Sequence, residues 1–183
     1  KTMKLINQIV LESKIPYGVF SLVEGTEKEV TKLITHPLVK GVTFVGSTPV
    51  AKIVGKLAIE HGKKTLCLGG AKNHLVVLPD ADMNLTADDV VRSFCGCTGQ
   101  RCMAASVLIL VGPMKLLLEK IKTKSEKFDM GRVIDENSKA RITNIISDID
   151  SDENCKLYLD GRTTTNLRPT IVIHKNTNNK YLD

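Results

Sequence analysis

A cysteine lies between an arginine and a methionine in the stretch GQRCMA, residues 99–104, after a segment of helical periodicity and before an apolar run. A cysteine thiolate is a strong nucleophile, and a neighbouring guanidinium together with nearby backbone amides favours the ionised form. The pattern makes Cys102 a candidate nucleophile, with Arg101 beside it. The alternative is that Cys102 is a small buried apolar side chain, which is the usual environment of a free cysteine.

A second candidate site lies in FVGSTPVAK, residues 44–52, where an apolar run ends at Gly46 and a helix capped by Ser47 or Thr48 is expected directly afterwards. A glycine followed by a helix N-terminus can bind an anion, because backbone N–H groups and the positive end of the helix dipole face the same point. An ordinary strand-to-helix turn with a hydroxyl cap has the same pattern. The dinucleotide motif G-x-G-x-x-G is absent here.

A third stretch, LGGAKNH, residues 68–74, contains the adjacent glycines Gly69 and Gly70. Paired glycines let a backbone approach a ligand closely, so they could flank a substrate or a cofactor. They would equally suit a flexible turn between two domains. Both interpretations stay open at this point.

The five cysteines are odd in number and lack the spacing of a small secreted disulfide framework, which favours a reducing compartment. Cys95, Cys97 and Cys102 lie within eight residues of each other. Without a C-x-x-C pair or a nearby histidine they make a poor zinc pattern, and we expect no metal site.

The composition is that of a soluble globular chain, with 183 residues, of which 42% are hydrophobic and 25% charged. Its apolar runs are too short to cross a bilayer, so we expect no membrane span. The net charge of +6 could indicate nucleic-acid binding. The lysines are mixed with acidic residues, however, and only 4% of the residues are aromatic, so we do not expect a nucleic-acid partner.

The elements that must position these residues alternate between strands and helices, which predicts an α/β domain with a parallel sheet covered on both faces. The expected helices cover residues 3–12, 25–35, 47–62, 85–97, 114–128 and 136–149. The expected strands are a short buried one within residues 14–23 and others at 41–46, 64–68, 74–79, 106–112, 155–159 and 170–174. From Gly69 the alternation restarts, which predicts a second α/β unit, and the polar C-terminal tail is expected to be unanchored.

Taken together, FVGST, LGGAKNH, PDADMN and GQRCMA, in this order, resemble the aldehyde dehydrogenase superfamily, and within it the CoA-acylating methylmalonate-semialdehyde dehydrogenases. The resemblance implies an aldehyde dehydrogenase-like α/β fold. Residues 1–68 would form the second half of a Rossmann-type NAD-binding domain, and residues 69–183 would form part of an α/β catalytic domain. It also implies an internal fragment that is inactive alone, because the family's oxyanion-stabilising asparagine would lie before Lys1.

The resemblance assigns roles to individual residues. Cys102 matches the nucleophile that attacks an aldehyde to give a thiohemiacetal, which passes a hydride to NAD and leaves a thioester. Arg101 matches an arginine associated with the substrate's carboxylate, which a guanidinium binds through two hydrogen bonds. The cofactor contacts that the resemblance implies are Gly25, Gly46, Ser47 and Gly70.

One departure from the wider family bears on the reaction. Hydrolytic aldehyde dehydrogenases carry a glutamate at the start of a motif like ELGGK, and Cys67 or Leu68 stands at that position here. Without a base for water, the thioester should last until the thiol of coenzyme A arrives. Loss of CO2 would give acetyl-CoA or propanoyl-CoA from malonate or methylmalonate semialdehyde. The alternatives are a hydrolytic NAD(P)-dependent aldehyde dehydrogenase and a non-catalytic fragment.

The resemblance further implies a parent protein that forms a homo-dimer or homo-tetramer, in the bacterial cytoplasm or the mitochondrial matrix. The residues leave open which of the two semialdehydes is preferred.

Overall fold

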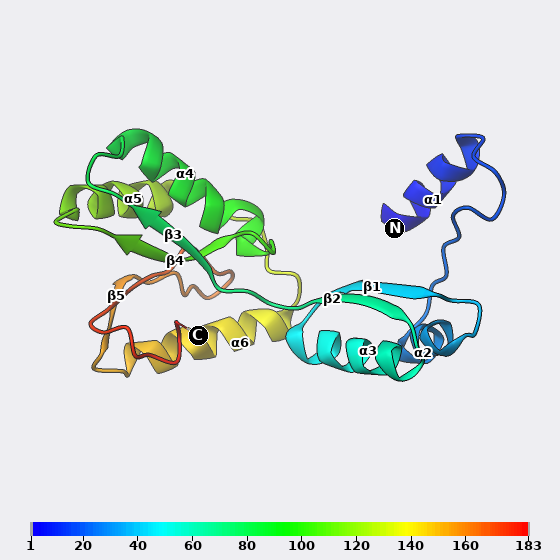
Figure 1. The fold of residues 1–183 in the computed structure, drawn as a ribbon. Coiled ribbons are helices and arrows are strands. Elements are labelled where there is room, and N and C mark those ends of the chain that lie inside the picture. Colours follow the sequence, from blue (N-terminus) through cyan, green and yellow to red (C-terminus); the bar gives the residue numbers. More distant parts are fainter. Residues whose placement is uncertain (1, 183) are drawn as a thin grey trace. The chain divides into compact units, whose positions relative to one another are not determined.

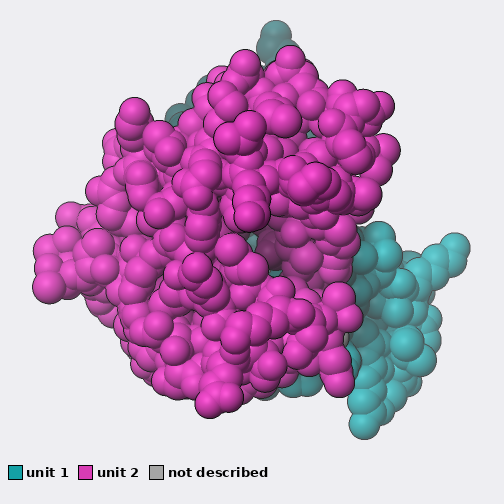
Figure 2. All heavy atoms as spheres, turned by 90° about the vertical axis from the view of Figure 1, so that its left-hand side faces the viewer, with its two compact units in different colours: residues 1–70 teal, residues 71–183 magenta. Residues whose placement is uncertain are grey.

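The computed structural model describes residues 2–182, and the chain divides into two compact units (Figures 1 and 2). Unit 1 extends to Gly70 and unit 2 begins at Ala71. Each unit has a hydrophobic cluster of its own. No helix among residues 2–182 is both long enough and apolar enough to cross a membrane.

Unit 1 contains a parallel pair of strands with three helices. Its elements are α1 (Thr2–Glu12), α2 (Glu27–Thr35), β1 (Gly41–Val45), α3 (Thr48–Glu60) and β2 (Lys64–Leu68). Helix α2 begins with a capping box, in which the Glu29 carboxylate accepts a hydrogen bond from the Thr26 backbone N–H at 2.7 Å. Helix α3 has a proline in its first turn, and Gly62 follows its end with a φ of +65°.

The core of unit 1 lies between α3 and one face of the strand pair. Ile34, Val54 and Ala58 are buried there. Val42 and Phe44 of β1 pack against them. Helix α3 covers this face because alternate strand residues point the same way.

The sequence-based prediction of a sheet covered on both faces is wrong for unit 1. Val45, Leu66 and Leu68 point away from α3 and are 64%, 56% and 49% exposed. The prediction assumed a second layer for every apolar strand residue, and the described residues of unit 1 do not supply one.

The strand predicted within residues 14–23 is also absent. This segment has no regular structure, and Tyr17, Val19 and Phe20 are exposed. Lys14 and Gly18 take positive φ values of 61° and 88°, which bend the chain out of an extended path. A strand needs a neighbour to bond with, and the described residues of unit 1 offer this segment none.

Unit 2 combines a parallel strand pair, an antiparallel pair and three longer helices. Its elements are β3 (Asn73–Val77), α4 (Met83–Cys95), the short 3-10 segment η1 (Gly96–Gly99), β4 (Ala105–Leu110), α5 (Lys115–Lys127), α6 (Glu136–Asp150), β5 (Cys155–Leu159) and β6 (Ile171–His174). Strands β3 and β4 are parallel, and β5 and β6 are antiparallel. Figure 1 shows α4 and α6 on opposite sides of the β3–β4 pair.

Helix α4 begins at Met83, two residues before the predicted start, because Asp82 caps it. The Asp82 carboxylate accepts hydrogen bonds from the N–H groups of Asn84 and Leu85 at 2.9 and 2.8 Å. The buried side of α4 packs on α5 and on β3. The buried members of this cluster are Val77, Ala87, Val90, Val91, Cys95, Met114, Leu117 and Ile121.

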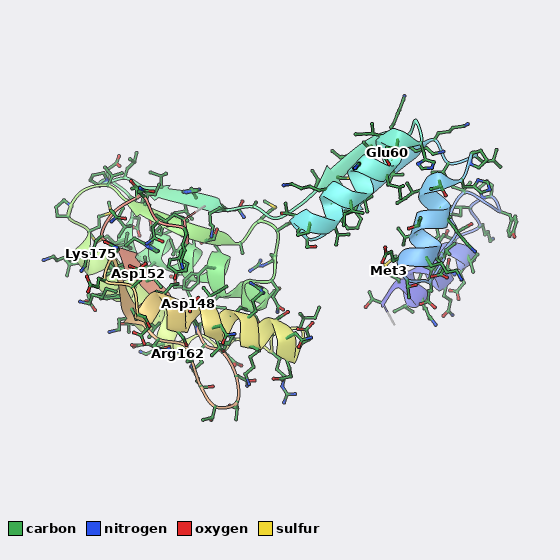
Figure 3. The ribbon with its side chains drawn as sticks, turned by 90° about the horizontal axis from the view of Figure 1, so that it is seen from below. Met3, Glu60, Asp148, Asp152, Arg162 and Lys175 are labelled. Carbon is green, nitrogen blue, oxygen red and sulfur yellow. The ribbon has the colours of Figure 1, made fainter. Side chains whose placement is uncertain are left out.

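Hydrogen bonds and ion pairs of side chains hold the C-terminal half of unit 2 together. Arg162, labelled in Figure 3, donates to Asp150 at 2.7 Å and to Asp160 at 2.6 Å. The contact with Asp150 fastens the loop after β5 to the end of α6. The tail was predicted to be unanchored, and this is wrong. Lys72 Nζ donates to the Tyr181 carbonyl at 2.9 Å, and Asn179 is buried. The partner, Lys72, lies more than a hundred residues away, so no local pattern reveals it.

Candidate functional site

The loop that carries Cys102 connects η1 to β4, and an amide side chain from β3 holds its backbone. Asn73 Nδ2 donates to the carbonyl of Cys102 at 2.8 Å and to that of Ala104 at 3.0 Å. Asn73 is the first residue of β3 and pairs with Ala105 of β4. A shift of register follows it, between Asn73 and His74. The asparagine therefore fixes the backbone on both sides of Met103.

The residues before Cys102 are held by two further anchors. Gln100 Oε1 accepts a hydrogen bond from the N–H of Ile134 at 2.8 Å, and its Nε2 donates to the carbonyl of Cys97 at 3.2 Å. Arg101 donates from Nε to the carbonyl of Gly96 and from Nη2 to that of Arg92, at 3.2 and 2.9 Å. Glutamine and arginine thus support the loop instead of facing solvent freely.

The position of Arg101 follows from the end of α4. The last carbonyls of a helix lack partners, and the negative end of the helix dipole favours a cation there. A Cβ on Gly96 would lie 1.7 Å from Arg101 Nη2, so the guanidinium occupies space that a larger residue would fill. Two of its five N–H groups are used on these carbonyls. No contact joins the guanidinium to the Cys102 thiol among the described residues, so the sequence argument that Arg101 ionises Cys102 directly gains no support.

The chain leaves α4 through three consecutive residues with left-handed backbone angles. The φ values of Cys97, Thr98 and Gly99 are 53°, 58° and 69°. Such angles are uncommon outside glycine and are strained for a β-branched residue such as Thr98. The backbone N–H and the side-chain Nε2 of Gln100 both donate to the Cys97 carbonyl across this turn, at 3.0 and 3.2 Å.

The structure separates the three neighbouring cysteines by environment. Cys97 and Cys102 are exposed, whereas Cys95 is fully buried. Burial raises the pKa of the Cys95 thiol to about 12, because a thiolate would lose its hydration. The buried apolar role considered for Cys102 therefore belongs to Cys95. Among residues 2–182, no three His, Cys, Asp or Glu side chains gather into a group that could hold a metal.

In unit 1 the two glycine motifs come together at the carboxyl ends of β1 and β2. The N–H of Gly46 donates to the Leu68 carbonyl at 3.1 Å, and the N–H of Gly70 donates to Thr48 Oγ1 at 2.9 Å. A Cβ on Gly69 would lie 2.8 Å from Thr48 Oγ1. The glycines are thus required for the LGG segment to lie against the first turn of α3.

Ser47 is the N-cap residue of α3, and its hydroxyl makes no capping hydrogen bond. The first N–H groups of α3 are therefore not satisfied by the Ser47 side chain. Such a helix start is suited to an anion. Gly25, the other expected cofactor contact, lies against the capping box of α2: a Cβ there would lie 2.4 Å from the Cβ of Glu29.

Cys67 and Leu68, which the sequence resemblance places where hydrolytic aldehyde dehydrogenases carry a glutamate, are the last two residues of β2. Cys67 is half-buried, with its Sγ 3.2 Å from Thr65 Oγ1, and the Leu68 side chain is 49% exposed. Neither residue is a carboxylate.

The role of Asn73 in holding the Cys102 loop was not predicted from the sequence, although its motif, LGGAKNH, is one of the candidate sites there.

The chain matches the aldehyde dehydrogenase family over residues 1–182. It therefore belongs to that family, as its motifs predicted, and the predicted mixed α/β fold is confirmed.

Among the relatives, a malonate-semialdehyde dehydrogenase from Halalkalibacterium halodurans is 37% identical over 85% of this chain. The mitochondrial methylmalonate-semialdehyde/malonate-semialdehyde dehydrogenase [acylating] from Bos taurus is 33% identical over 86% of this chain. The chain spans about a third of the length of each, at 34% and 31%.

Two solved structures extend the likeness. A methylmalonate-semialdehyde dehydrogenase from Oceanimonas doudoroffii superposes with a TM-score of 0.90 at 30% identity, covering 97% of this chain and 40% of that one. A 1-pyrroline-5-carboxylate dehydrogenase from Thermus with bound NAD has a TM-score of 0.80 at 26% identity, covering 92% of this chain and 36% of that one.

The burial of Cys95 predicts selective alkylation. With iodoacetamide at pH 8, we expect Cys97 and Cys102 to be modified in the folded chain while Cys95 stays unmodified, because its raised pKa keeps it protonated. Peptide mapping by mass spectrometry measures this. Unfolding in denaturant should expose Cys95 to the reagent, and alkylation of Cys95 at the rate of Cys97 in the native chain would contradict the assignment.

The two hydrogen bonds from Asn73 predict that the variant Asn73→Asp is less stable. Aspartate keeps the shape but cannot donate when ionised, so we expect a loss of about 1–3 kcal/mol in the free energy of unfolding and faster hydrogen exchange at residues 101–104. Chemical denaturation and exchange mass spectrometry measure the two effects. A surface control is Asn137→Ala on the exposed side of α6, which should change the free energy of unfolding by less than about 0.5 kcal/mol. Equal effects of the two substitutions would exclude a special role for Asn73.

Proposed function

We propose that the protein oxidises malonate or methylmalonate semialdehyde and transfers the resulting acyl group to coenzyme A, using NAD as the hydride acceptor. The observation that carries the proposal is an exposed cysteine on a loop fixed by Asn73, Gln100 and Arg101. The relatives with this activity in their names support the choice of substrate.

In this reaction the Cys102 thiolate adds to the aldehyde carbon and forms a thiohemiacetal. Loss of a hydride from that carbon leaves a thioester on Cys102 and releases a proton. A malonyl thioester loses CO2 more easily than free malonate does. The reason is that its thioester carbonyl stabilises the enolate that remains better than a carboxyl group would. The anchored loop contributes by holding the sulfur in one place, since its backbone carbonyls are already bonded to Asn73.

The residues of unit 1 fit the pyrophosphate of NAD. Gly46, Ser47 and Gly70 would hold it at the start of α3, where the helix start favours an anion. A Cβ on Gly46 would lie 2.6 Å from the Phe44 ring, and one on Gly70 would lie 3.3 Å from Thr48 Oγ1. NAD, when bound, supplies the hydride acceptor. Residues 1–68 are thus proposed as part of the cofactor domain and residues 69–183 as part of the catalytic domain. The NAD bound in the Thermus relative supports this assignment.

The acyl acceptor follows from the absence of a carboxylate at residues 67 and 68. A cysteine and an exposed leucine cannot take a proton from water as the glutamate of hydrolytic relatives would. The thiol of coenzyme A needs less activation, because a thiol ionises far more readily than water does. The word "acylating" in the name of the Bos taurus relative supports this acceptor.

The remaining N–H groups of Arg101 are proposed to bind the carboxylate of the semialdehyde. Its guanidinium is held one residue before the nucleophile, with three of its five donors not used on the carbonyls of α4.

The test is the rate of NADH formation by the protein expressed from its complete gene. At saturating NAD and malonate semialdehyde without coenzyme A, we expect one burst of NADH per active site and then a slow phase, because the thioester accumulates. Adding coenzyme A should raise the steady rate roughly a hundredfold. Cys102→Ser should abolish the burst, whereas Cys97→Ser, the matched change at an exposed neighbour, should keep it. Equal steady rates with and without coenzyme A would indicate the hydrolytic alternative.

A further inference from the structure

A second group of reactive side chains lies in the hairpin of β5 and β6, apart from the Cys102 loop in sequence. Cys155 and His174 are directly opposite each other in the antiparallel register. Side chains of such a pair point to the same face, and the Cys155 Sγ lies 3.5 Å from His174 Nδ1. Cys155 and His174 are both half-buried.

A third side chain contacts the same sulfur. Asn179 Nδ2 lies 3.3 Å from the Cys155 Sγ, and Asn179 is buried. The orientation of its amide is fixed, because Asn179 Oδ1 accepts a hydrogen bond from the Tyr181 N–H at 2.9 Å. The NH2 group must therefore point at the sulfur. An N–H donor directed at sulfur stabilises a thiolate better than a thiol. The amide oxygen of Asn179 faces the Tyr181 N–H and not the sulfur, so it could not bind a metal beside Cys155.

Hydrogen bonds on either side hold this arrangement in place. The Cys155 N–H donates to the Asp152 carbonyl at 2.9 Å, and the Lys175 N–H donates to the Asn154 carbonyl at 2.9 Å. Lys175 Nζ also reaches the Glu153 carbonyl at 2.6 Å. Figure 3 labels Asp152 and Lys175, the charged residues that border the cysteine end of the hairpin. The groups around the Cys155 sulfur therefore lie where hydrogen bonds hold the ends of β5 and β6 in place.

We propose that Cys155 is a second reactive thiol, activated by His174 and Asn179, and that it is a site of thiol–disulfide exchange with low-molecular-mass disulfides such as oxidised glutathione. Neither the candidate nucleophile Cys102 nor the buried Cys95 has this set of neighbours among the described residues. The inference is independent of the activity proposed above.

The exchange balances without a further reactant. The Cys155 proton passes to His174, and the thiolate attacks one sulfur of the disulfide. The new S–S bond joins Cys155 to that sulfur while the old S–S bond breaks. The other sulfur leaves as a thiolate and takes the proton, so Cys155 is oxidised, the small disulfide is reduced, and one small thiol is released.

The test is the rate of glutathione attachment to each cysteine of the whole chain at pH 7.4, measured by peptide mapping after timed exposure to oxidised glutathione. We expect Cys155 to react about tenfold faster than Cys97, although Cys97 is the more exposed, because only Cys155 has an imidazole beside its sulfur to take the proton and an amide N–H directed at it. His174→Gln and Asn179→Ala should each slow the Cys155 reaction severalfold and leave the Cys97 rate unchanged.

The same map reports whether a variant is folded, because Cys95 is protected only inside the packed core of unit 2. If a variant exposes Cys95, the variant is unfolded. The rates of Cys155 and Cys97 in the unsubstituted chain then show whether Cys155 is the more reactive thiol. Reaction of Cys155 no faster than that of Cys97, or an unchanged Cys155 rate in a folded His174→Gln chain, would overturn the proposal.

Discussion

The candidate site in unit 2 depends on one asparagine that satisfies two backbone carbonyls of a loop. A loop between a helix and a strand has carbonyls with no ladder to join, and each needs a partner. Asn73 supplies both N–H groups of its amide to the carbonyls of Cys102 and Ala104. The loop is thereby fixed through its backbone, and the thiol of Cys102 stays free to react. Gln100 and Arg101 complete the support from the other side.

Most helices and strands of the fold could be predicted from the sequence, because local patterns of residue types determine them. The periodicity around α3 and the Ser47–Pro49 start predicted that helix, and the apolar run of β4 predicted that strand. The strand expected within residues 14–23 is absent because apolar composition alone does not provide a neighbouring strand. The second layer predicted on the β1–β2 pair is absent from the described residues of unit 1, because apolar strand residues do not by themselves supply a covering element.

Sequence patterns single out residues of the candidate site, but not the contacts between them. Cys102 stands out by its neighbours in the sequence, and the two glycine motifs stand out by composition. The contact between Gly70 and Thr48 spans 22 residues, and that between Asn73 and Cys102 spans 29. Neither follows from a local pattern. The cross-strand pairing of Cys155 with His174 likewise depends on the register of β5 and β6, which sequence periodicity leaves undetermined.

Placement, rather than residue type, distinguishes the cysteines of unit 2. Cys95 lies in the core and remains protonated, Cys102 is presented on an anchored loop, and Cys155 shares its sulfur with an imidazole and an amide. The central claim is that Cys102 alone carries the acyl group of the reaction.

The most direct measurement is peptide mapping of the protein from its complete gene after mixing with NAD and malonate semialdehyde, without coenzyme A and with an acid quench. The account predicts a thioester-linked acyl group on the Cys102 peptide that disappears when coenzyme A is added before the quench. An acyl group on another cysteine, or NADH formation with no acyl group on Cys102, would contradict it.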